Sequence, residues 1–450
     1  MKIKNIIAIH LLILFLFSCG KTPESTVTTE VVHPEWIKKA IMYEVNIRQY
    51  TPEGTFNAFA SHLPRLKDLG VDILWLMPVH PIGVENRKGS LGSYYSVKDY
   101  KGINPEFGTM EDFKTLVKMV HDLDMYLVID WVPNHSAWDN PLVSEHPEWY
   151  AKDSTGKMFS PFDWTDVVQF DYNQQGLRDY MTETLEYWLE ETDLDGFRFD
   201  VAHQVPIDFW EQLRPDLQEN YPDVLMLAEA ENRELHEKAF DMTYAWEFHH
   251  IMNEVAQEKK SVEDINKYIE SSTTSYHPND IRLYFTSNHD ENSWNGTVRE
   301  RMGEAAEVMA VLTYGLPGMP LIYSGQEAGL DHRLLFFEKD TIPWKEHSFK
   351  TLYTKLNMLK KDNPALWNPG FGGDYEAIST DKPGEIIAFK RVKGENEVLF
   401  VLNMSPDSIR TNLSDMPVAE VFTNVFSGET ESFSNSDVDL RPWGYKIFFR

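Results

Sequence analysis

The chain has 450 residues, of which 71 are acidic and 42 basic, so its formal net charge is −29 at pH 7. This balance excludes nucleic acid as an expected partner, because binding to a phosphate backbone needs a basic surface. A single cysteine, Cys19, excludes an intramolecular disulfide.

The first residues, 1–19, have the layout of an export signal. Two lysines precede an apolar stretch at 6–17 that only His10 interrupts, and this stretch is too short for a stable membrane-spanning helix. The sequence LFSCG at 16–20 resembles a bacterial lipobox, in which the cysteine becomes the lipidated first residue after cleavage. The alternative is an ordinary buried cysteine that follows a secretory signal.

Residues 20–34 are predicted to be a flexible tether. Their content of Thr, Ser, Glu and Pro cannot bury a core. We therefore expect an exported protein that Cys19 anchors through its lipid to a membrane of the bacterial cell envelope. The membrane face and the oligomeric state stay open.

The region 35–369 is predicted to form a (β/α)8 barrel, a fold that needs about 250 residues. Apolar strand candidates alternate with helical segments, which is the pattern of parallel βα units. The helical candidates 111–123 and 177–190 carry apolar residues at three- and four-residue spacing. The eight strand candidates are 41–45, 71–77, 126–130, 196–200, 224–227, 242–246, 283–286 and 320–323.

Two further segments depart from this alternation. A compressed insertion with several prolines and aromatic residues is expected at about 135–173, after the third strand. After a last helix at 351–361, residues 370–450 alternate between strands and turn-forming clusters, as at 385–390 and 397–402. This region is predicted to be an antiparallel, β-sandwich-like domain.

Polar motifs end four of the barrel strand candidates, and each delivers a carboxylate. Three of these carboxylates, Asp200, Glu229 and Asp290, follow apolar runs, at the strand ends where a parallel barrel builds its active site. Converging acids suit a reaction that needs one ionised and one protonated carboxylate. The motifs are DWVPNH at 130–135, GFRFD at 196–200, MLAE at 226–229 and SNHD at 287–290.

In their residues and in their order along the chain, these motifs resemble those of the α-amylase family of glycoside hydrolases, and the resemblance runs from about residue 41 to the C-terminus. The resemblance implies a retaining hydrolase that cleaves α-glucosidic bonds in starch-like α-glucans or maltooligosaccharides. It implies that Asp200 is the nucleophile and Glu229 the acid/base, as retention requires two carboxylates. Asp290 would then be the third carboxylate, which hydrogen-bonds sugar hydroxyls.

The residues next to the two main carboxylates agree with these roles. Arg198 lies two positions before Asp200, so both side chains share a strand face. We expect the guanidinium to lower the pKa of Asp200 and keep it ionised. Glu229 has no adjacent cation in the sequence, which suits an acid that stays protonated. The alternative for Arg198 and Asp200 is a purely structural ion pair.

The resemblance also implies a set of substrate-binding residues. His135 would donate to the O6 hydroxyl of the attacked glucose, and His289 and Arg198 would lie beside it. Tyr95, in the stretch YSVKDY at 95–100, would stack on the same sugar. Asp130 is expected to brace Arg198 rather than to contact sugar.

At two positions after the nucleophile this chain differs from many members of the family, which limits the roles that can be transferred to it. Many relatives have Lys and then His shortly after the nucleophile, whereas this chain has His203 and Gln204. We expect His203 to contact substrate, and we expect no required cofactor. Asn134 could give a side-chain oxygen to a structural calcium ion, although the insertion has no obvious acidic ligand set.

Two alternatives remain open. A transglycosylase of the same fold would use the same motifs, with a sugar in place of water. A non-catalytic glucan-binding lipoprotein is disfavoured, because Asp200, Glu229, Asp290 and Arg198 are all present. The preference for α-1,4 or α-1,6 bonds and for internal or terminal cleavage stays open.

Overall fold

The computed structural model describes residues 31–413, 421–432 and 437–450. Cys19, the predicted export signal and most of the predicted tether lie outside these residues. Within the described ranges, no helix is both long and apolar enough to cross a bilayer.

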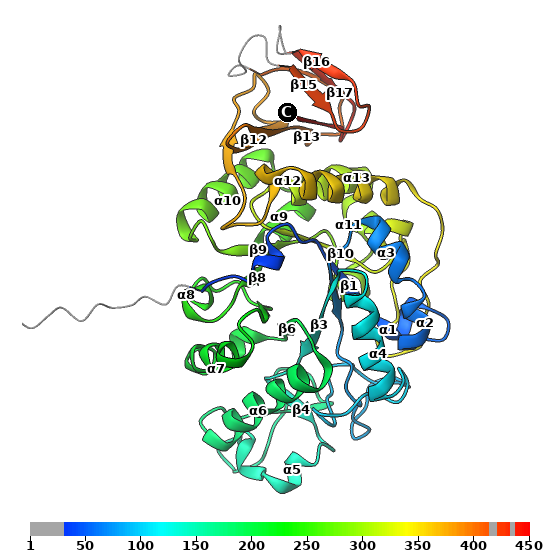
Figure 1. The fold of residues 1–450 in the computed structure, drawn as a ribbon, viewed down its shortest axis with the longest axis vertical. Coiled ribbons are helices and arrows are strands. Elements are labelled where there is room, and N and C mark those ends of the chain that lie inside the picture. Colours follow the sequence, from blue (N-terminus) through cyan, green and yellow to red (C-terminus); the bar gives the residue numbers. More distant parts are fainter. Residues whose placement is uncertain (1–30, 414–420, 433–436) are drawn as a thin grey trace, which may run out of the picture.

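Eight parallel strands close into a barrel in the order β1-β10-β9-β8-β7-β6-β3-β2 (Figure 1). The predicted barrel is therefore confirmed, and each predicted strand has its counterpart. The strands are β1 (Met42–Val45), β2 (Ile73–Leu76), β3 (Tyr126–Trp131), β6 (Gly196–Phe199), β7 (Leu225–Ala228), β8 (Met242–Tyr244), β9 (Ile281–Tyr284) and β10 (Met319–Tyr323).

Every second side chain of each strand points into the barrel. Met42, Trp75, Val128, Leu227 and Leu283 form part of one buried apolar cluster inside the barrel. Because side chains on a strand alternate between faces, the same period brings polar side chains to the C-terminal rim. Those rim residues are Glu44, Asp130, Arg198 and Glu229.

Helices surround the barrel, and a second apolar cluster joins them to the outward faces of the strands. The predicted helices 111–123, 177–190 and 351–361 correspond to α4, α6 and α13. The helices are α1 (Ile47–Tyr50), α2 (Phe56–Ala60), α3 (Leu63–Leu69), α4 (Met110–His121), α5 (Leu142–Glu145), α6 (Gln175–Thr192), α7 (Ile207–Asn220), α8 (Leu235–Lys238), α9 (Trp246–Ala256), α10 (Val262–Ser275), α11 (Val298–Met302), α12 (Ala306–Gly315) and α13 (Ser348–Asp362).

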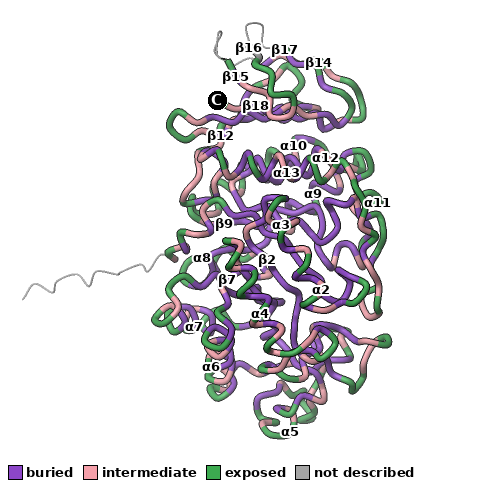
Figure 2. Tube along the Cα trace, turned by 45° about the vertical axis from the view of Figure 1, so that its right-hand side comes forward, coloured by how far each residue is buried: buried purple, intermediate pink, exposed green. Residues whose placement is uncertain are grey.

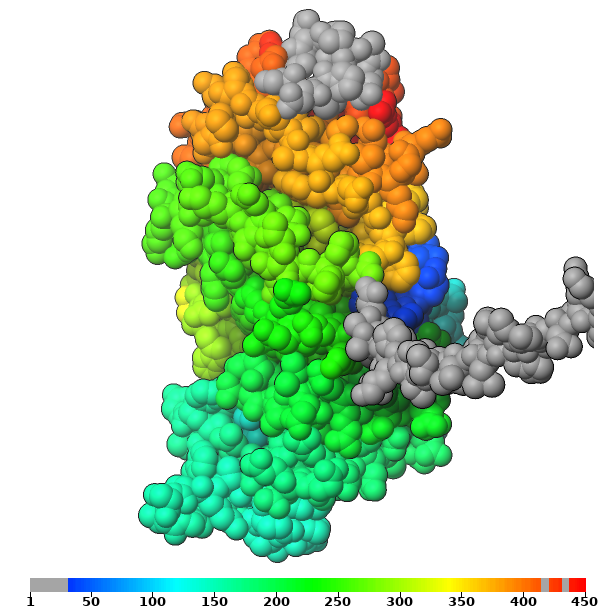
Figure 3. Space-filling view, turned by 90° about the vertical axis from the view of Figure 1, so that its left-hand side faces the viewer, coloured from blue at the N-terminus to red at the C-terminus, as the bar shows by residue number. Residues whose placement is uncertain are grey.

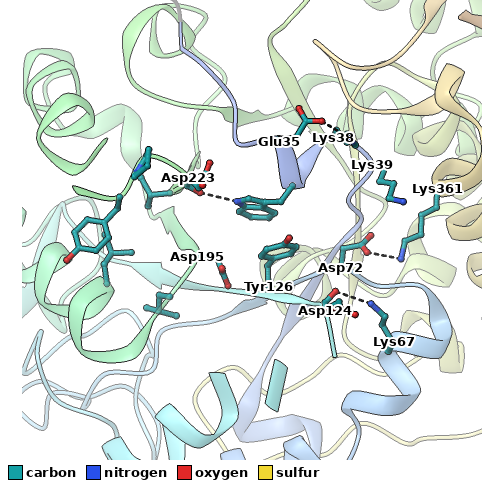
Figure 4. A pocket seen from close by; sticks show the side chains of 16 residues that line it. Glu35, Lys38, Lys39, Lys67, Asp72, Asp124, Tyr126, Asp195, Asp223 and Lys361 are labelled. Atoms are coloured by element: carbon teal, nitrogen blue, oxygen red, sulfur yellow. Dashed lines mark hydrogen bonds and ion pairs between the residues drawn. The ribbon is translucent and has the colours of Figure 1, made fainter. Parts of the chain in front are cut away.

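An aromatic pair covers the N-terminal end of the barrel. Trp36 stacks on Tyr126 with ring centroids 4.0 Å apart, and its indole N–H donates to the carbonyl of Asp223 at 3.1 Å. A cavity of about 900 Å³ lies around this pair (Figure 4). Its wall contains two ion pairs, Lys361 with Asp72 at 2.8 Å and Lys38 with Glu35 at 2.6 Å. The Trp36–Tyr126 pair therefore packs over the end of the barrel that lies opposite the carboxylates.

The insertion after β3 is built on a small antiparallel sheet. Strand β4 (His135–Ala137) pairs with β5 (Val167–Gln169), and α5 lies between them in the chain. The insertion and the C-terminal domain project from opposite ends of the molecule (Figure 3).

The C-terminal domain has a six-stranded sheet in the order β11-β12-β13-β18-β15-β16 and a two-stranded sheet of β14 and β17. It lies over α12 and α13, and buried segments continue through this layer into the barrel (Figure 2). Its strands are β11 (Asp374–Ala377), β12 (Ile386–Lys393), β13 (Asn396–Asn403), β14 (Ile409–Asn412), β15 (Val421–Asn424), β16 (Thr430–Ser432), β17 (Asp437–Leu440) and β18 (Tyr445–Phe449). The predicted antiparallel β-domain is confirmed.

Candidate active site

One buried guanidinium, that of Arg198 on β6, joins three carboxylates at the C-terminal rim. Its Nη1 donates to Asp130 Oδ1 at 2.8 Å and to Asp200 Oδ1 at 3.0 Å. Its Nη2 lies 3.0 Å from Glu229 Oε2, as an ion pair without hydrogen-bond alignment. Arg198 and Asp130 are both fully buried. Asp130 therefore braces Arg198, as expected from the sequence.

Aromatic residues inside the barrel hold the guanidinium from below. Its Cζ lies 5.1 Å from the ring centroid of Trp75, within cation–π range. Its Nε donates to the hydroxyl of Tyr244 at 3.2 Å. Arg198 is thus fixed in place by contacts on several sides.

The contact between Arg198 and Glu229 corrects an expectation. The sequence places no cation next to Glu229, but Arg198 pairs with Leu227 across the parallel strands β6 and β7. Glu229 follows Leu227 by two residues and so lies on the same face, within reach of the guanidinium. The expectation that no cation lies beside Glu229 was therefore wrong, because residues that are neighbours across a sheet need not be neighbours in the chain.

The pKa of Asp200 also departs from expectation. Burial raises this pKa well above its usual value, the charge of Glu229 raises it further, and Arg198 offsets only part of the increase. The expected lowering was wrong because it counted one cation and neither burial nor the adjacent carboxylates. The site therefore holds protons more readily than isolated carboxylates do.

Val201, directly after Asp200, has a left-handed backbone with φ 47° and ψ 38°. This conformation is strained for a β-branched residue, and such strain concentrates at functional sites. The backbone N–H of Val201 donates to Glu229 Oε2 at 2.8 Å. The strained turn thus fixes the two main carboxylates relative to each other.

A second network runs from Asp130 to the opposite wall of the barrel. The hydroxyl of Tyr95 donates to Asp130 Oδ2 at 2.9 Å and accepts from His289 Nε2 at 2.8 Å. His289 Nδ1 donates to Glu44 Oε1 at 2.5 Å. Burial alone would lower the pKa of His289, but the charges of Asp290 and Glu44 outweigh it and raise the pKa to about 9. His289 is therefore an imidazolium at neutral pH.

Sequence reasoning missed Glu44. The available signal was an acidic residue within the apolar strand 41–45, since a charge inside a barrel strand needs a buried partner. Burial raises the pKa of Glu44, although His289 opposes this effect.

Asp290 and His135 complete the set of predicted residues around the cleft. Asp290 precedes a π-helical turn at Glu291–Asn295 and lies with Oδ2 3.4 Å from His289 Nε2. Burial lowers the pKa of His135 to about 3, so its ring is neutral. The side-chain amide of Asn134 lies 3.2 Å from His135 Nδ1.

Two adjoining cavities form one cleft around these residues. The first, of about 430 Å³, is lined by the predicted Tyr95, His135, Asp200, Glu229, His289 and Asp290. The second, of about 460 Å³, contains the predicted His203 and shares Val201, Trp164 and Glu229 with the first. Glu229 therefore stands between the two halves of the cleft.

Aromatic side chains in both halves were not predicted. Phe162 and Trp246 line the second cavity, while Trp294, Phe336 and Phe337 line the first. Phe162 is 65% exposed and has a φ of 53°, which is unusual for a large apolar residue. Aromatic faces beside carboxylates suit the binding of sugar rings, which present both apolar faces and hydroxyls. Phe162, Phe336 and Phe337 lie outside the predicted strands and helices, where no periodicity gives a sequence signal.

The insertion does not offer a calcium site of the kind considered for Asn134. Two of its carboxylates are already paired with lysines, Asp139 with Lys98 at 2.9 Å and Asp166 with Lys88 at 3.2 Å. In the part of the chain that the structure describes, no three acidic, histidine or cysteine side chains group around a metal position. The residues present therefore do not fit a calcium ion, and no step is derived through one.

Comparisons with known families agree with this geometry. The family model described as "Alpha amylase, catalytic domain" matches residues 25–167 and 140–383. The model described as "Alpha amylase, C-terminal all-beta domain" matches residues 378–444.

Solved structures and relatives give the same result. A noncanonic maltogenic α-amylase from Thermotoga neapolitana is 32% identical, with a TM-score of 0.82 over 92% of this chain and 97% of that one. An α-amylase from Lactobacillus plantarum is 30% identical, with a TM-score of 0.83 over 92% and 99%. An α-1,4-glucan:maltose-1-phosphate maltosyltransferase from Picrophilus torridus is 27% identical over 86% of this chain, which spans 64% of that protein's length.

Proposed function

The chain belongs to the α-amylase family of glycoside hydrolases, and on this premise we propose that it is a retaining hydrolase of α-glucosidic bonds. Asp200 is the nucleophile and Glu229 the acid/base, acting on starch-like α-glucans or maltooligosaccharides. The observation that supports this most is the single guanidinium of Arg198, which lies 3.0 Å from an oxygen of each of these two carboxylates.

In the first step, Glu229 gives its proton to the glycosidic oxygen while an oxygen of Asp200 attacks the anomeric carbon. The bond from that carbon to the leaving oxygen breaks, and an ester between the glucosyl unit and Asp200 forms. Arg198 offsets the negative charge on Asp200 before attack. Burial raises the pKa of Asp200, and Arg198 opposes this effect, which favours the ionised form that attacks.

In the second step, Glu229 takes a proton from water, and the water oxygen attacks the anomeric carbon. The ester bond breaks, Asp200 leaves as a carboxylate, and the product keeps the α configuration. The N–H of Val201 holds Glu229 in one position through both steps. This contact favours one residue serving first as acid and then as base.

The other residues of the first cavity bind the attacked sugar. Asp290, 36% exposed at its side chain, accepts from sugar hydroxyls, and the imidazolium of His289 beside it offsets part of the charge of Asp290. Such bonds accelerate the reaction only where they strengthen in the transition state. Tyr95 supplies a ring face, and its hydroxyl ties that ring to Asp130.

Transfer to a sugar instead of water is the second candidate. It is supported by the second cavity, where Phe162 and Trp246 offer ring faces on the leaving-group side of Glu229. A relative named as a maltosyltransferase is consistent with it. Sugar bound there would compete with water for the ester on Asp200.

We also propose that Cys19 is lipidated and anchors the enzyme to a membrane of the cell envelope. The support comes from the lipobox-like sequence at 16–20 and from the tether-like composition of residues 20–34. Trp36 packs at the barrel base, at the end of the barrel opposite the carboxylates. A tether that leaves from this base would direct the cleft away from the membrane.

Product analysis tests the proposed hydrolysis. Soluble starch, pullulan, cyclodextrins and a maltooligosaccharide are incubated with the wild type and with Asp200→Asn, and the products are separated by chromatography. The proposal expects shorter maltooligosaccharides from at least one substrate with the wild type and none with the variant. Products longer than the starting maltooligosaccharide would favour transfer, and no reaction at all would contradict the proposal.

A further inference from the structure

The two halves of the cleft have opposite roles in the proposed reaction. Glu229 protonates the leaving group, so Trp246 and His203, which lie beyond it, face the aglycone. Tyr95 and Asp290 bind the attacked sugar, so the first cavity contains the glycone, the part of the chain on the nonreducing side. How far the glycone can extend depends on what ends this cavity.

The segment 84–91, which follows β2, is fastened on one side to residues that follow β10. The backbone N–H of Ser90 donates to Glu338 Oε1 at 2.9 Å, and that of Leu91 donates to the carbonyl of Phe337 at 3.0 Å. Gly89 has a φ of +63°, and a Cβ there would lie 2.5 Å from Cβ of Phe337. This close approach requires glycine, so the segment is seated firmly on its neighbour.

The same segment is fastened on its other side to the insertion. The backbone N–H of Val84 donates to both oxygens of Asp139 at 3.1 Å. Lys88 Nζ lies 3.2 Å from Asp166 Oδ1, and the carbonyl of Asp166 accepts from Ser96 Oγ at 3.0 Å. Lys88 and Asp166 both line the glycone cavity. Their ion pair therefore joins two walls of that cavity.

Aromatic residues occupy the remaining wall. Trp294 packs on Phe336 with ring centroids 5.1 Å apart, and both line the same cavity. Its volume of about 430 Å³ lies toward the small end of the about 300–1,000 Å³ usual for ligand pockets. The glycone side is therefore bounded by three walls, and a long glucan would have to displace one of them to continue.

We propose that the Lys88–Asp166 ion pair closes the glycone end, so that the enzyme cleaves α-glucans close to their nonreducing ends and releases short products. The ammonium group of Lys88 also donates to hydroxyls of the terminal glucose unit. This inference deepens the proposed function and rests on it, because it takes the cleft to be an α-glucan site.

The test uses maltoheptaose that carries a chromophore at its reducing end. Early products are separated by chromatography, and the length of each labelled fragment gives the position of the cut. In the wild type the label stays on fragments that have lost only a few glucose units. In Lys88→Ala and Asp166→Asn, the opened end raises the share of cuts farther from the nonreducing end by about threefold, the effect of losing a modest ion pair.

Lys98→Ala is the matched control. It removes the Lys98–Asp139 ion pair, which also joins the chain after β2 to the insertion but lies outside the cavity, so it should leave the cutting pattern of the wild type unchanged. An unchanged pattern in Lys88→Ala, or an equal broadening in Lys98→Ala, overturns the inference and leaves the proposed hydrolysis intact. If the wild type cuts evenly along the substrate, this also overturns the inference and leaves the proposed hydrolysis intact. Failure to cleave any α-glucan overturns the proposed function itself.

Discussion

Nη2 of Arg198 lies 3.0 Å from Oε2 of Glu229, while Nη1 of the same guanidinium bonds Asp200. One cation therefore serves both carboxylates of the proposed reaction. It is fully buried, as is Asp130, its third partner. We therefore expect both the stability of the fold and the catalytic activity to depend on Arg198.

Replacing Arg198 tests this double role. Arg198→Met would leave buried carboxylates without a counter-charge, a change that costs about 3–5 kcal/mol of unfolding free energy, and activity should be lost. Urea unfolding measures the first effect. Arg333→Met is the control, because its side chain and that of its partner Glu300 are each 47% exposed, and it should cost less than about 1 kcal/mol. Equal costs in the two variants would contradict the role assigned to Arg198.

The raised pKa of His289 predicts a pH dependence of stability. The protonated ring favours the folded state, so the contribution is full below the ordinary value of 6.5 and is lost as pH rises through about 9. Over this window we expect the unfolding free energy to fall by on the order of 3 kcal/mol. His289→Gln should flatten the slope, whereas His332→Gln, at a side chain that is 47% exposed, should not. A slope that survives in His289→Gln would exclude His289 as its source.

The barrel and its carboxylates could be predicted from sequence because they follow from local patterns. Short apolar runs gave the strands, and the two-residue period placed Arg198 and Asp200 on one face. Contacts between distant segments gave no such signal. The bond between Glu44 and His289, the ion pair of Arg198 with Glu229 and the burial that sets the pKa of Asp200 all depend on how strands meet. Residues such as Lys88 and Phe162 lie in segments without periodicity, and only the folded chain brings them to the cleft.

Removal of divalent metal should leave catalysis intact. The proposed reaction uses protonation by Glu229, and lysines already pair with Asp139 and Asp166 of the insertion. After dialysis against EDTA, turnover at about 20 °C should stay near that of untreated enzyme, and any ion that binds the fold would show instead as a lower melting temperature. Complete loss of turnover in a folded protein, restored by calcium, would contradict this prediction.

Anchoring through Cys19 predicts a change of location without a change of activity. Cys19→Ala should move the enzyme from the membrane fraction to the soluble fraction, while its specific activity stays that of the wild type, because the barrel begins well downstream. Fractionation followed by assay measures both. Mass spectrometry of the mature wild-type protein should find no residues before Cys19. A variant that still sediments with membranes would contradict lipid anchoring.

The configuration of the first product tests the two-carboxylate mechanism most directly. Proton NMR can follow the anomeric signals during the first minutes of maltooligosaccharide cleavage, before mutarotation mixes them. A retaining reaction through an ester on Asp200 predicts that the α-anomer appears first. Asp200→Asn should lower turnover at least about 1,000-fold and give neither anomer at this timescale. A β-anomer as the first product of the wild type would contradict the assignment of Asp200 as nucleophile.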